Sequence, residues 1–85
     1  MERTELITTI IEVFLEYKLF NKSFKVSEVK NSIDENLNDI EFVESMINTI
    51  MINTKERKKV NTDKIKRLLL ELERIRLELE FKGEK

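Results

Sequence analysis

The chain has 85 residues, with sixteen Lys and Arg against seventeen Asp and Glu, so its formal net charge is −1. It contains no Cys, no His and a single Gly. This composition excludes disulfides, Cys nucleophiles, Ser-His triads, the common zinc ligands and the glycine-rich loops that bind phosphates.

The first predicted helix covers residues 4–20. Five apolar residues follow the i, i+3, i+4, i+7, i+8 spacing of a buried helical stripe: Ile7, Ile10, Ile11, Phe14 and Leu15. Other apolar residues widen this face, among them Leu6, Val13, Tyr17 and Phe20. A helix with so broad an apolar face is expected at the centre of a bundle, where packing stabilises it.

A short second helix is predicted over residues 27–36. Ser27 is placed to act as its N-cap, because a serine hydroxyl can accept a hydrogen bond from the free N–H groups of the first turn. Val29 and Ile33 lie four residues apart and form its apolar face.

A third helix is predicted over residues 39–53. Asn38 precedes Glu41 by three residues, which resembles a capping box with Asn in place of Ser or Thr. The apolar face of this helix comprises Ile40, Val43, Met46, Ile47, Ile50 and Met51.

The fourth and longest helix is predicted over residues 63–82. Its apolar residues step by three and four, as in the a/d seam of a coiled coil: Ile65, Leu68, Leu72, Ile75 and Leu79. Residues 75–81 also alternate between apolar and charged, which is typical of a strand. We predict a helix because Leu, Glu and Arg are strong helix formers and because charges recur at i, i+4. The expected fold is therefore an all-α bundle of three to four helices in one domain over residues 1–85.

The seam of the fourth helix is the first candidate functional surface. A second apolar set, Leu70, Leu77 and Phe81, shares the helix with it, so one apolar flank of the helix remains for a partner once the other packs on the first helix. We expect the chain to form a homodimer through this helix, with the five seam residues at the interface. The alternative is that the bundle covers both flanks.

A basic segment is the second candidate. Residues 1–54 hold ten acidic and five basic residues, whereas residues 55–67 hold seven basic and two acidic ones. The basic residues are Lys55, Arg57, Lys58, Lys59, Lys64, Lys66 and Arg67. They could neutralise nucleic-acid phosphates, or they could pair with the acidic first half of the same chain or of a second copy.

The two helices within residues 26–53 could form a helix-turn-helix unit. The N-terminal end of its recognition helix, however, carries Asp39, Glu41 and Glu44, whose charge repels DNA phosphates. A plain corner between two helices is the alternative interpretation.

Together these features predict a small non-enzymatic regulator or adaptor that binds a protein partner or itself. The alternative is a transcriptional regulator that docks residues 26–53 on nucleic acid and contacts phosphates through residues 55–67. We expect no catalytic residue, metal, cofactor or small-molecule substrate. A cytoplasmic location is expected, because no apolar run approaches the ~20 residues that span a membrane and no secretory signal is visible at the start.

Overall fold

The structure is a computed structural model that describes residues 1–20, 25–55 and 62–83. These ranges hold four helices, α1 (Arg3–Glu16), α2 (Val26–Asn36), α3 (Ile40–Lys55) and α4 (Thr62–Gly83), and no strand. The predicted all-α fold is confirmed, and residues 75–81 are helical as expected.

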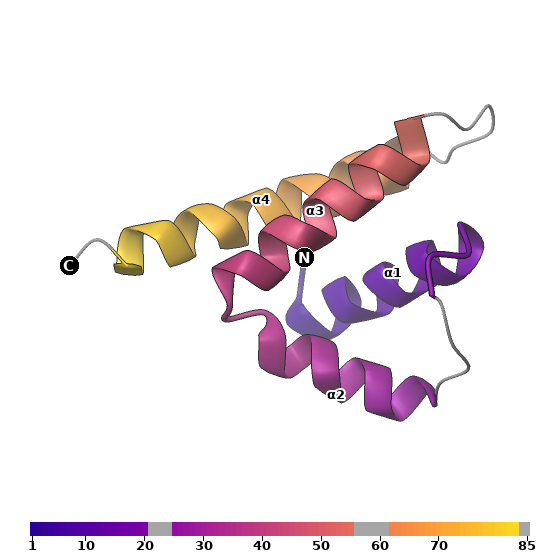
Figure 1. Ribbon diagram of the computed structural model, residues 1–85, viewed down its shortest axis with the longest axis horizontal. Helices are drawn as coiled ribbons and strands as arrows, with labels where there is room; N and C mark the ends of the chain where they lie inside the picture. Colours follow the sequence, from indigo (N-terminus) through magenta and orange to yellow (C-terminus); the bar gives the residue numbers. More distant parts are fainter. Residues whose placement is uncertain (21–24, 56–61, 84–85) are drawn as a thin grey trace.

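The helices form two hairpins (Figure 1). In one hairpin α1 packs against α2. In the other, α3 packs against α4 along most of the length of α3. Contacts between α1 and α4 join the two hairpins. The C-terminal end of α4 extends beyond the start of α3 (Figure 1), so its last turns have fewer neighbours than its middle.

All four helices contribute to one apolar core. The side chains of Ile10, Leu68 and Leu72 are fully buried there, and none of the described residues is a buried polar or charged one. Apolar burial therefore supplies the main stabilisation between the helices, at about 25 cal/mol per Å² of surface removed from water.

The first helix ends earlier than predicted, at Glu16 instead of residue 20. Lys18 adopts a left-handed backbone with φ of 54°. The Leu19 N–H donates to the Phe14 carbonyl at 2.8 Å and the Lys18 N–H to the Leu15 carbonyl at 3.2 Å. This is the Schellman arrangement, with Lys at the position where glycine is usual.

The predicted caps of the next two helices are wrong in detail. α2 begins at Val26, so Ser27 lies inside the helix, and the N-cap residue Lys25 makes no side-chain capping bond. At the start of α3, Asp39 Oδ1 accepts a hydrogen bond from the Glu41 N–H at 3.0 Å. Asp39 therefore replaces Asn38 as the capping side chain, one residue later than the capping-box pattern indicated.

Candidate functional site

The predicted interface seam lies in the core of the chain itself. Ile65, Leu68 and Leu72 are buried, and Ile75 and Leu79 are half-buried against the same core. Because α4 packs on both α3 and α1, the bundle covers the seam from two sides. This corrects the expectation for the three buried residues, which have no surface left for a second chain in this fold.

A different set of apolar side chains on α4 faces away from the core. Leu70, Leu77 and Phe81 have exposed fractions of 69%, 44% and 73%. At about 100° per residue, these three positions lie within roughly 40° of one another and opposite the seam. We call Leu70, Leu77 and Phe81 the outward stripe. The sequence identified these residues as a second apolar set, and the structure shows that this set is the one left exposed.

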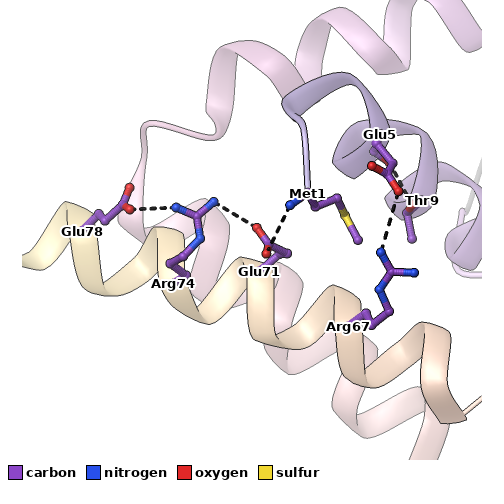
Figure 2. A network of polar contacts seen from close by, with 7 residues as sticks. All are labelled: Met1, Glu5, Thr9, Arg67, Glu71, Arg74 and Glu78. Atoms are coloured by element: carbon purple, nitrogen blue, oxygen red, sulfur yellow. Dashed lines mark hydrogen bonds and ion pairs between the residues drawn. The ribbon is translucent and has the colours of Figure 1, made fainter.

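Ion pairs within α4 neutralise the charges beside the middle of the stripe (Figure 2). Arg74 donates to Glu78 Oε1 and to Glu71 Oε2, both at 2.9 Å, and Glu71 also lies 3.6 Å from the Met1 amino group. The hydrogen bond from Arg74, with its positive charge, lowers the pKa of Glu71. The same contacts raise the pKa of Arg74.

A second group of ion pairs lies on the other side of the stripe, because each of its residues is two positions, or about 200°, beyond its counterpart in the first group. Arg76 bonds to Glu73 and, at 2.6 Å, to Glu80 Oε1. The hydrogen bond from Arg76 lowers the pKa of Glu73. Both carboxyl pKa shifts are downward, whereas a general acid at neutral pH needs an upward shift.

Part of the basic segment pairs with α1. Lys64 Nζ lies 2.7 Å from Glu12 Oε2 and 4.0 Å from Glu16 Oε2. Arg67 Nη2 lies 3.8 Å from Glu5 Oε1 (Figure 2). These contacts are of the kind expected if the basic residues pair with acidic residues in the first half of the same chain.

The remaining basic residues fall into two groups. Lys55 and Lys66 are exposed, on α3 and α4 respectively. Arg57, Lys58 and Lys59 lie outside the described residues.

The candidate helix-turn-helix pair is divided between the two hairpins. The main packing partner of α2 is α1 and that of α3 is α4. Arg3 on α1 links α1 to α2 by donating hydrogen bonds to Asp34, at 2.5 Å to Oδ1 and 2.7 Å to the backbone carbonyl. At the start of α3, Glu41 and Glu44 are exposed, so the end that would meet DNA is acidic.

The described parts of the chain contain no cluster of three or more Asp or Glu side chains placed to hold a metal ion. Nor does any helix within them combine the length and apolarity needed to span a membrane.

No protein-family model, curated protein or solved structure matches the chain.

Proposed function

We propose that the chain is a non-enzymatic interaction protein that pairs with a second copy of itself through the outward stripe of α4 and acts as a regulator or adaptor in that form. The observation that supports this is the contrast across α4, where Leu68 and Leu72 are fully buried while Leu70 and Phe81 are 69% and 73% exposed. Exposed apolar side chains aligned along one face mark a binding surface, because covering them with a partner lowers the free energy of the complex.

Charge favours a second copy in the antiparallel orientation. Lys66 and Glu80 flank the stripe on one side, and Arg67 and Glu78 flank it on the other. A two-fold axis between residues 73 and 74 places Lys66 near Glu80 of the second copy. It also places Arg67 near Glu78 of the second copy and Leu70 beside its Leu77.

The parallel orientation is less favourable. It places the first turns of the two α4 helices side by side, and residues 62–67 hold three basic residues and one acidic one. Like charges at an interface are repulsive, and the repulsion acts mainly on partner orientation and association rate. Three exposed apolar residues per chain make a small interface, so we expect a micromolar dissociation constant and not a nanomolar one.

Sedimentation equilibrium on the full chain tests the proposal. Leu70→Glu places a charge on the stripe, and Ile52→Glu is its matched control because Ile52 on α3 is also 69% exposed. We expect the unmodified chain and Ile52→Glu to approach the mass of two chains as concentration rises, and Leu70→Glu to remain at one. The proposal is wrong if the unmodified chain stays monomeric up to ~1 mM, or if both substitutions weaken association equally.

The nucleic-acid alternative makes a separate prediction. Binding through residues 26–53 and 55–67 would weaken log-linearly as salt concentration rises, because phosphate contacts release counterions. Under our proposal a labelled duplex or single strand shows no binding by fluorescence anisotropy at 150 mM salt. Saturable binding with a steep salt dependence would favour the alternative.

A further inference from the structure

A cavity of about 300 Å³ opens between the two hairpins, where α1, α2 and α3 meet. Its floor includes Ile10, Ile33 and Met46, which are buried members of the core. The cavity is therefore open to solvent on one side and reaches core side chains at its base. We call it the inter-hairpin cavity.

Aromatic side chains form much of its wall. Phe14 and Phe20 pack with their ring centroids 5.2 Å apart and their planes at 49°, and Phe42 lines the cavity from α3. Aromatic walls provide large apolar surfaces and favour edge-to-face contacts with a ring placed between them.

Among the described residues that line the cavity, the polar side chains are three hydroxyls, and none is charged. Ser32 on α2 and Ser45 on α3 are exposed at its edge, and Thr49 is half-buried one turn beyond Ser45. The Thr49 hydroxyl donates to the Ser45 carbonyl at 2.8 Å, so its oxygen can still accept a hydrogen bond. Because the lining contributed by residues 10–20, 25–36 and 40–55 includes no ionised side chain, a charged ligand would lose hydration against these residues without gaining a counter-ion from them.

We infer that the inter-hairpin cavity binds a small uncharged molecule with an aromatic or short aliphatic body and one polar group that reaches the hydroxyls. Its volume is about twice the ~150 Å³ of an apolar protein cavity that holds benzene, which limits the ligand to roughly a dozen non-hydrogen atoms. Small-molecule sites in proteins are typically concave, mostly apolar and supplied with a few polar groups of this kind. No residue of α4 lines the cavity, so this inference does not depend on pairing through the outward stripe.

Titration of the ¹⁵N-labelled full chain with indole and 2-naphthol, followed by amide NMR shifts, tests the inference. We expect saturable shifts at Val29, Ser45 and Thr49, and at least tenfold weaker binding of benzoate, which is similar in size but charged. Absence of saturable shifts up to the solubility limit of both neutral probes would overturn the inference. So would shifts confined to other parts of the chain, or benzoate binding as tightly as indole.

A pair of variants on α3 separates this site from general binding to apolar surface. Ser45→Phe places a ring at the cavity edge and should weaken indole binding more than tenfold. Asn48→Phe places the same ring at an exposed position that does not line the cavity and should change binding less than twofold. If circular dichroism shows Ser45→Phe to be unfolded, Ser32→Phe on the facing helix replaces it. Equal binding to the edge variant and the control contradicts the assignment.

Discussion

Leu72 and Leu70 lie two residues apart on α4, yet the side chain of Leu72 is fully buried and that of Leu70 is 69% exposed. Two residues correspond to about 200° around a helix, so the pair points in nearly opposite directions. The same helix therefore contributes one apolar face to the core and presents another to the surroundings.

Truncation of the two leucines should have very different effects on stability. Leu72→Ala removes buried methyl groups and leaves a cavity, so we expect it to lower the free energy of unfolding by about 2.7–5 kcal/mol. Leu70→Ala should change it by less than about 0.5 kcal/mol when the chain is dilute enough to be monomeric. Urea denaturation followed by circular dichroism measures both, and equal losses would contradict the assignment of core and outward faces.

The end of α1 offers a stabilising substitution. Lys18 holds a left-handed backbone, which crowds the Cβ of any residue other than glycine. Lys18→Gly should therefore raise the free energy of unfolding by about 0.5–1 kcal/mol. Lys30→Gly, at an exposed position inside α2, is the control and should lower it by about 1 kcal/mol. Destabilisation by Lys18→Gly would show that this Schellman turn does not form.

The contact between Lys64 and Glu12 should contribute little to stability in spite of its short distance. Both side chains are partly exposed, so water and salt screen their attraction. A double-mutant cycle of Lys64→Met and Glu12→Gln is expected to give a coupling energy below about 1 kcal/mol, smaller still at 1 M salt. A larger coupling that does not change with salt would indicate a pair shielded from water.

Acid should destabilise the chain partly through Glu71. Arg74 holds the Glu71 pKa below its ordinary value of 4.5 in the folded chain, so the unfolded chain binds the proton more readily. The stabilisation from this group is present above pH ~4.5 and is lost as the pH falls through the folded pKa. Glu71→Gln and Arg74→Gln should each make stability less dependent on pH below 4.5. Acid curves for both variants that match the unmodified chain would contradict this role.

Much of the fold could be predicted because the apolar residues have a clear helical period. The spacing of Ile7, Ile10 and Ile11 and the 3, 4, 3, 4 steps of the α4 seam located helices that the structure contains. The end of α1 could not be predicted, because the apolar pattern continues to Phe20 and Lys18 is not the glycine that usually marks a helix end.

The candidate site was harder to predict from sequence. Periodicity identifies two apolar faces on α4 but does not say which of them the bundle covers, because that depends on how α1 and α3 pack against it. The pairing of Lys64 with Glu12 joins residues 52 positions apart, and nothing in the local sequence indicates such a contact. The inter-hairpin cavity likewise depends on the arrangement of three helices.

The most direct test of pairing through α4 is disulfide cross-linking of single-cysteine variants. The chain contains no cysteine of its own, so the introduced thiol is the only one that can react. In the antiparallel pair, residue 74 lies beside its copy, whereas two copies of residue 63 are about 30 Å apart, far beyond the ~7 Å between Cα atoms that a disulfide allows. We predict that mild oxidation links Arg74→Cys into a covalent dimer and leaves Asp63→Cys monomeric. Failure of Arg74→Cys to cross-link, or efficient cross-linking of Asp63→Cys, would contradict antiparallel pairing through the outward stripe.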